Sequence, residues 1–209
     1  MIDFILFGVI AYVLGSIPTA VWVGRVWHGI DVREHGSKNA GATNTFRVLG
    51  KKSGITVLSV DIVKGFIGVF LPFIAGVGAW GSDALIHVQL IAAICAVLGH
   101  VFPVFAGFKG GKGAATSLGV IIGIQPLAAS LCLVIFLIVF IASKYVSLGA
   151  ICAAVSFPIL VNVVFGITSN WLMVFSIVLS SAVIVAHHKN IRRLLAGEEN
   201  KMNLFKNKA

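Results

Sequence analysis

Long apolar segments recur along the whole chain and constrain its fold more than any other feature. The chain has 209 residues, of which 58% are hydrophobic and 11% are charged, and a soluble domain carries roughly twice that share of charge. Because the apolar residues come in continuous runs instead of alternating with polar ones, they need the hydrocarbon of a bilayer around them. The sequence therefore predicts an all-α integral membrane protein that forms a single domain over residues 1–209.

Seven transmembrane helices are predicted from these runs. The expected spans cover residues 2–27, 55–77, 86–105, 114–125, 127–142, 148–165 and 171–186. Pro18 is expected to kink the first span, and Pro126 is expected to separate the fourth span from the fifth. One long helix kinked at Pro126 is the alternative, and it would reduce the count to six.

The basic residues gather on one side of this arrangement. With seven spans, the loops at 28–53 and 107–113, Lys144 and the tail from residue 187 share one side, and the other side carries no Lys or Arg. The positive-inside rule makes the basic side cytoplasmic, so the N-terminus is expected outside and the C-terminus inside. Six spans would place Lys144 and the tail outside, so the asymmetry favours the break at Pro126. Loops of this kind explain the net charge of +9 without a nucleic-acid partner.

The stretch Gly36–Arg47 is a polar, glycine-punctuated island between two apolar spans. It holds hydroxyls, amides and two cations but no carboxylate, which is typical of an anion site. Glycine lets backbone N–H groups turn inward, and arginine offers a bidentate fork to phosphate oxygens. The candidate ligands are Ser37, Asn39, Thr43, Asn44 and Arg47. A solvated basic loop between two helices is the alternative interpretation.

Two further polar clusters fall on the same predicted side. Gly110, Gly111, Lys112 and Gly113 precede the fourth span, where a lysine and free N–H groups at a helix N-terminus can surround a phosphate. The cluster is not a Walker A loop, because Gly113 stands where Ser or Thr would hold magnesium.

The third cluster begins where the last span ends. His187 and Asn190 are three residues apart and share one face if that helix continues. The cations that follow them could instead anchor the chain to anionic lipids.

The three clusters, in this order, resemble the motifs of a known family. Glu34–Asn44, Phe102–Gly113, Asn190–Gly197 and the early Gly15–Pro18 are similar to the bacterial PlsY family, the integral-membrane acyl-phosphate:glycerol-3-phosphate acyltransferases. The resemblance implies a seven-helix fold in the bacterial plasma (inner) membrane, with membrane lipids around it and the active site at the cytoplasmic face. It also implies transfer of a fatty acyl group from acyl phosphate to the 1-hydroxyl of sn-glycerol 3-phosphate. The product would be lysophosphatidic acid, made in the first acylation step of phospholipid synthesis.

The resemblance also assigns roles to individual residues. It implies that glycerol 3-phosphate is bound, and its hydroxyl placed, by Ser37, Arg47, Lys112, His187 and Asn190. Among these, His187, Lys112 and Arg47 are the expected catalytic residues. Gly110, Gly111 and Gly113 are expected to shape the acyl-phosphate pocket. Glu199 is expected to order the turn that precedes it in the chain, at Leu194–Gly197. The adjacent His188 departs from the family pattern, so the base could be His187, His188 or the substrate's own phosphate.

The chemistry expected of this site needs no protein nucleophile and no cofactor. An acyl phosphate is already an activated anhydride, and the sequence has neither a Gly-x-Ser-x-Gly elbow nor the His-x4-Asp pattern of acyl-CoA-using acyltransferases. We therefore expect direct transfer without a covalent acyl-enzyme. No carboxylate cluster near the candidate phosphate sites calls for a metal, and the three cysteines lie in apolar runs without ligand or disulfide spacing.

Asp61 and Lys64 lie deep in the second span and share a helix face. A charge pair at this depth must face protein or a wet cavity, and both a packing role and a catalytic role are open. The small residues Gly65 and Gly68 are expected to leave room for the fatty chain. A transporter for phosphorylated metabolites is the rival function, because buried charges and broken helices suit it.

Overall fold

The computed structural model describes residues 1–166 and 169–202, and over these ranges the chain is helical with no strand. This confirms the all-α prediction. The α-helices are α1 (Ile2–Gly15), α2 (Thr19–His28), α3 (Ala42–Leu49), α4 (Lys51–Ile74), α5 (Asp83–Val101), α6 (Ala114–Ile124), α7 (Pro126–Ser143), α8 (Val146–Ile159), α9 (Asn170–Ala186) and α10 (His188–Leu195). Short 3-10 helices η1 (Val32–Glu34) and η2 (Val104–Ala106) lie in the loops, and a π-helix η3 (Leu160–Val164) extends α8.

Five helical segments of the described chain are long and apolar enough to cross a membrane. They are Ile2–His28, Lys51–Ile74, Asp83–Ala106, Pro126–Ser143 and Val146–Val164. α9 and α10 reach that length only as a pair bent by 60°. α6 has 11 residues, about 17 Å of helix, against a hydrocarbon core of about 30 Å. The count of seven and the orientation stay predictions, although α6 and α7 are separate helices on either side of Gln125, as the Pro126 break required.

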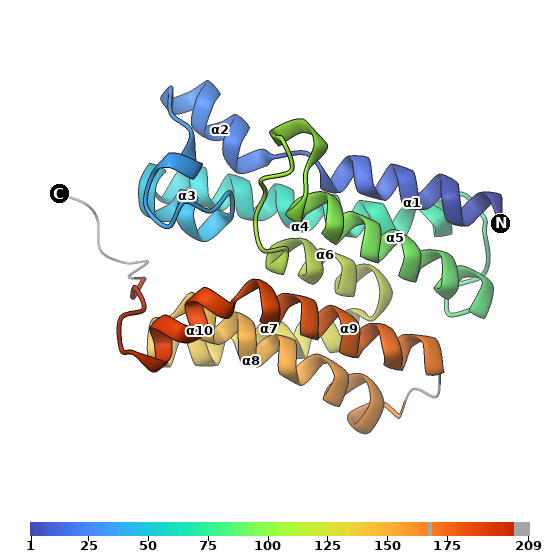
Figure 1. Cartoon of the computed structure of the whole chain (residues 1–209). Helices are drawn as coiled ribbons and strands as arrows, with labels where there is room; N and C mark the ends of the chain where they lie inside the picture. Colours follow the sequence, from blue (N-terminus) through green and yellow to red (C-terminus); the bar gives the residue numbers. More distant parts are fainter. Residues whose placement is uncertain (167–168, 203–209) are drawn as a thin grey trace.

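The helices form two packed groups (Figure 1). In the first group, α1 packs against α5 and α4 packs against α6; in the second, α8 packs against both α7 and α9. α6 joins the groups through its contact with α7. α2 and the polar helices α3 and α10 lie at the same end of the bundle, away from the N-terminus (Figure 1). The first and third polar clusters of the sequence are therefore brought to one end.

Glycines allow α4 and α6 to touch backbone to backbone. A Cβ atom on Gly65 would overlap the carbonyl oxygen of Thr116, and one on Gly119 would overlap that of Ile62. The expectation that Gly65 and Gly68 leave room for a fatty chain is wrong. α6 fills the space at Gly65, and the space at Gly68 is taken by small side chains of α1 and α5.

The first span is broken where Pro18 was expected to disturb it, between α1 and α2. The break exposes the Ile17 carbonyl, and the Lys64 ammonium donates to that oxygen at 2.8 Å. The same nitrogen lies 2.8 Å from Asp61 Oδ1, and the Thr19 hydroxyl donates to that carboxylate at 3.3 Å. Asp61 holds Lys64 where its ammonium satisfies the free Ile17 carbonyl at the helix break. The structure therefore favours a packing role for the Asp61–Lys64 pair.

Candidate active site

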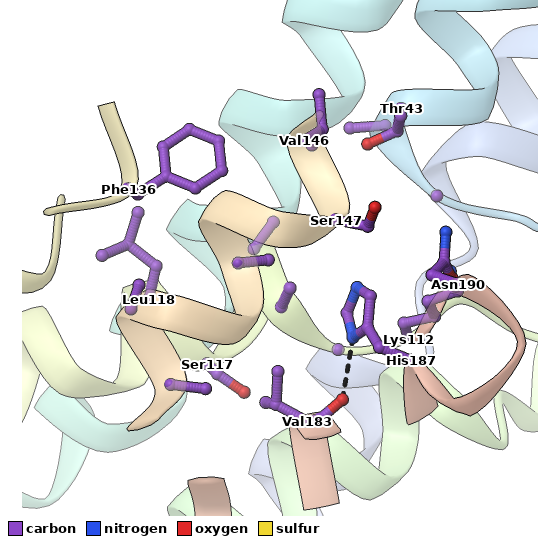
Figure 2. Close-up of a pocket in the computed structure, with 18 of the residues that line it drawn as sticks. Thr43, Lys112, Ser117, Leu118, Phe136, Val146, Ser147, Val183, His187 and Asn190 are labelled. Carbon is purple, nitrogen blue, oxygen red and sulfur yellow. Dashed lines mark hydrogen bonds between the residues drawn. The ribbon is translucent and has the colours of Figure 1, made fainter. Parts of the chain in front are cut away.

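A cavity of about 400 Å³ lies between the two helix groups and reaches the polar end of the bundle. Its polar lining includes Ser37, Asn39, Thr43, Arg47, Lys112, Gly113, His187 and Asn190. Its apolar lining includes Ile121, Leu133, Phe136, Leu137, Phe140 and Phe157. Figure 2 shows side chains of both kinds around the same space. The cavity therefore has a charged head end and a hydrocarbon-like body.

The structure brings together most of the residues singled out from the sequence. Every candidate ligand except Gly110 and Gly111 lines the cavity. Gly110 and Gly111 were expected to shape the pocket, but neither of them lines it. Their N–H groups donate to α5 carbonyls, from Gly110 to Val101 and from Gly111 to His100, each at 3.1 Å. Both glycines also pack so closely on His100 that a Cβ would overlap it, so they seat the loop that carries Lys112.

Asn44 also has a different role from the one predicted. Its amide nitrogen donates to the carbonyls of Val32 at 2.8 Å and His35 at 3.1 Å. Its oxygen accepts from the backbone N–H of Ser37 at 2.8 Å and from the Ser37 hydroxyl at 3.1 Å. Four bonds saturate a carboxamide, and the side chain is only 2% exposed. Asn44 touches the cavity wall, but its polar atoms are committed to folding the loop that presents Ser37.

A chain of hydrogen bonds fixes the head end of the cavity. The Lys112 ammonium donates to the Asn190 side-chain oxygen, and the Asn190 amide donates to Glu199 at 2.9 Å. Arg193 donates to the other carboxylate oxygen of Glu199 at 2.7 Å. Although burial opposes ionisation, the bonds from Arg193 and Asn190 hold the pKa of Glu199 below its ordinary value. Glu199 thus orders the loop after α10, as the sequence predicted, and through Asn190 it positions Lys112.

Lys112 is easier to deprotonate than an ordinary lysine. Burial, and then the positive charges of Arg193 and Arg47, lower the pKa of Lys112 from 10.5 to about 8. Cations that repel one another across an empty space form a site for an anion, because a bound anion removes the repulsion. The head end is therefore a cationic site suited to an anion.

His187 lies just past the last residue of α9 and points a ring nitrogen into the cavity. Its Nδ1 donates to the Val183 carbonyl at 2.8 Å (Figure 2), because a carbonyl can only accept. Burial and the nearby charge of Lys112 lower the pKa of His187 to about 4. The ring is therefore neutral at pH 7, with the proton on Nδ1 and a lone pair on Nε2.

His188 faces away from the site. It is exposed, does not line the cavity, and its Nδ1 is 2.9 Å from the Val185 carbonyl. Of the two adjacent histidines, only His187 can therefore reach a molecule in the cavity.

Two serines in the cavity wall escaped the sequence analysis. Ser117 on α6 and Ser147 on α8 line the cavity, and the buried hydroxyl of Ser117 has no hydrogen-bond partner in the part of the chain that the structure describes. Ser147 lies at the head end with Asn190 and His187 (Figure 2). Their signal in sequence was weak, because a lone serine in an apolar run is usually bonded to its own helix.

Fold and site together define a class of protein: a helical bundle with membrane-length apolar helices, whose cavity joins a cationic head end to an apolar body. Comparison with known proteins narrows this class. Residues 5–197 match the family model described as glycerol-3-phosphate acyltransferase. The chain belongs to the glycerol-3-phosphate acyltransferase family, a group of enzymes of phospholipid synthesis.

Relatives and solved structures agree with this assignment over nearly the whole chain. Glycerol-3-phosphate acyltransferase from Chlorobaculum tepidum is 41% identical, covering 97% of this chain and 98% of the relative. The enzyme from Fusobacterium nucleatum is 42% identical, and the match covers 95% of this chain and 97% of the relative. The crystal structure of PlsY (YgiH), an integral membrane glycerol 3-phosphate acyltransferase, in its glycerol 3-phosphate form has a TM-score of 0.84. It is 36% identical, covering 97% of this chain and 99% of that one. The lysophosphatidic acid form of PlsY gives a TM-score of 0.81. The chain is therefore an integral membrane protein of this family.

Proposed function

We propose that this protein transfers a fatty acyl group from acyl phosphate to the 1-hydroxyl of sn-glycerol 3-phosphate, giving lysophosphatidic acid and phosphate. The observation that carries the proposal is the two-part cavity, with Arg47 and Lys112 at its head end and an apolar body along α7 and α8. One end suits two phosphate groups, and the other suits a fatty chain. The glycerol 3-phosphate and lysophosphatidic acid forms of the similar PlsY support the acceptor and the product.

Charge neutralisation is the first task of the site. Both substrates carry phosphate, and two phosphates in a cavity repel each other strongly unless cations lie between or beside them. Arg47 offers a planar fork and Lys112 a point charge, and the Asn190–Glu199 contacts hold Lys112 in place. Catalysis here consists largely of positioning and electrostatics, because the acyl phosphate is already activated.

His187 places the acceptor hydroxyl. Its Nε2 lone pair faces the cavity and can accept the hydrogen bond of the 1-hydroxyl, which aims the hydroxyl oxygen at the acyl carbon. A histidine with a pKa of about 4 holds a proton weakly. A phosphate that departs with the bonding electron pair is a stronger base even than a phosphate monoester, whose second pKa is about 6. We assign the proton to the departing phosphate and the orientation of the hydroxyl to His187. No acyl-enzyme is required.

The basic end of the bundle is proposed to face the cytoplasm. Arg47, Lys112 and residues 187–202 lie at this end, and this segment returns to the α7–α8 turn, where the Met202 N–H donates to the Lys144 carbonyl at 2.8 Å. The positive-inside rule then places the cavity mouth at the cytoplasmic face of the bacterial inner membrane. Glycerol 3-phosphate would enter from the cytoplasm.

In the test, the purified protein is incubated with labelled glycerol 3-phosphate and with one of two acyl donors, palmitoyl phosphate or palmitoyl-CoA. Labelled lysophosphatidic acid from palmitoyl phosphate alone is the expected result. Product from both donors would reject the acyl-phosphate selectivity, and product from neither would reject the proposed reaction. In the last case, uptake of intact label by proteoliposomes would identify a transporter instead.

A further inference from the structure

Ser117 is a buried hydroxyl that the reaction as described leaves without a task. It is 4% exposed, lines the cavity, and has no hydrogen-bond partner among the residues described. Several other hydroxyls in helices of this chain donate to the carbonyl four residues back, including those of Thr56, Ser130 and Ser143. Ser117 forms no such bond to Gly113, although the Gly113 carbonyl accepts its backbone N–H at 2.7 Å. Its donor is therefore unused among the described residues, and because a serine hydroxyl rotates, it can turn toward the cavity that the residue lines.

The position of Ser117 along the cavity identifies the part of the substrate that it meets. Ser117 is four residues beyond Gly113 on α6, about 6 Å below the head end at 1.5 Å per residue. Leu118 and Ile121, which begin the apolar body, follow it on the same helix. In an acyl phosphate, the carbonyl is the polar group that joins the phosphate to the hydrocarbon chain. Ser117 thus lies at the level where the carbonyl oxygen falls when the phosphate is at Lys112 and the chain is in the apolar body.

We propose that the Ser117 hydroxyl is a catalytic hydrogen-bond donor to the acyl carbonyl oxygen, and this inference rests on the proposed function. The acceptor hydroxyl oxygen forms a bond to the carbonyl carbon, whose π electrons move onto the carbonyl oxygen. That oxyanion accepts the Ser117 hydrogen bond. The carbonyl then re-forms, the bond from carbon to the phosphate oxygen breaks, and the phosphate leaves with the electron pair and the acceptor's proton. A donor aimed at charge that develops only in the transition state increases kcat more than affinity.

The test compares Ser117→Ala with a matched control, Ser16→Ala. Ser16 is also a fully buried serine without a hydroxyl partner among the described residues, but it does not line the cavity. With palmitoyl phosphate and glycerol 3-phosphate, Ser117→Ala is expected to lower kcat at least tenfold, roughly the loss on removing one buried donor. The KM for glycerol 3-phosphate should change little. Ser16→Ala is expected to keep the wild-type kcat.

Conservative variants separate chemistry from folding. Ser117→Thr keeps a hydroxyl and should retain most of the activity. Ser117→Cys keeps the size but donates weakly, so it should lose activity while its unfolding temperature stays at the wild-type value. A wild-type kcat in Ser117→Cys, or equal losses in the Ala and Thr variants, would overturn the inference. Failure of the proposed function is a different result, because the wild-type protein itself would then form no product from palmitoyl phosphate.

Discussion

Removing the buried carboxylate of Asp61 is expected to destabilise the protein strongly. Asp61 is 2% exposed and Lys64 is 4% exposed, so Asp61→Ala leaves an ammonium inside the bundle without its counter-ion. Breaking a buried ion pair from one side costs about 3–5 kcal/mol. Lys64 also donates to the Ile17 carbonyl, which persists in the variant, so we expect the lower part of that range. At about 2–4 °C per kcal/mol for a chain of this length, the unfolding temperature should fall by about 6–12 °C.

Thermal unfolding of the purified protein in detergent, followed by tryptophan fluorescence at one fixed scan rate, measures this change. The matched control is the double variant Asp61→Ala/Lys64→Met, which removes both charges. Replacing a whole buried ion pair by apolar groups is often neutral, but Lys64→Met also removes the donor to the Ile17 carbonyl. The double variant should therefore recover part of the lost stability. A single variant as stable as wild type would refute the reasoning, and so would a double variant that is less stable than the single one.

Three further predictions concern the site. The kcat/KM for glycerol 3-phosphate should fall as pH rises through about 8, because Lys112, protonated below its pKa of about 8, then loses its charge; a flat profile from pH 6 to 9.5 would contradict this. His187→Gln should misplace the acceptor hydroxyl and lower kcat by about 10²-fold, while exposed His188→Ala stays near wild type. Equal rates in the two variants would remove His187 from the chemistry. Gly111→Ala should abolish most activity although Gly111 does not itself line the cavity, because its Cβ would displace the His100 ring and with it the Lys112 loop. Rates at the wild-type level would show that the loop tolerates the change.

Much of this architecture could be predicted from the sequence, because a bilayer imposes simple rules on length and polarity. The apolar runs located the helices, and Pro18 and Pro126 marked real breaks. Helix ends were harder. α4 begins at Lys51, whereas the apolar pattern placed its start at residue 55, because the first turn of this helix is polar and lies outside the hydrocarbon run.

The site was predictable in its composition and less so in its detail. Charge and glycine content pointed to Arg47 and Lys112, the resemblance to the family added His187, and all three line one cavity. The roles of Asn44 and Gly111 could not be read from sequence. A carboxamide can bind a ligand or a loop equally well, and a glycine can admit a phosphate or a neighbouring ring. Only the tertiary contacts with Val32 and His100 decide between these uses.

One wall of the cavity belongs to the outer surface of the bundle. Leu133 and Leu137 on α7 line the cavity and are also 39% and 42% exposed, and in a membrane their exposed atoms face lipid. Under the proposed function, a donor with a fatty tail would reach the site by diffusing in the plane of the bilayer, whereas glycerol 3-phosphate would arrive from water. The two concentrations that set the rate are then of different kinds, one a molarity and the other a mole fraction among lipids. Adding inert lipid at constant total donor should slow the reaction by surface dilution, even though nothing in the aqueous phase has changed.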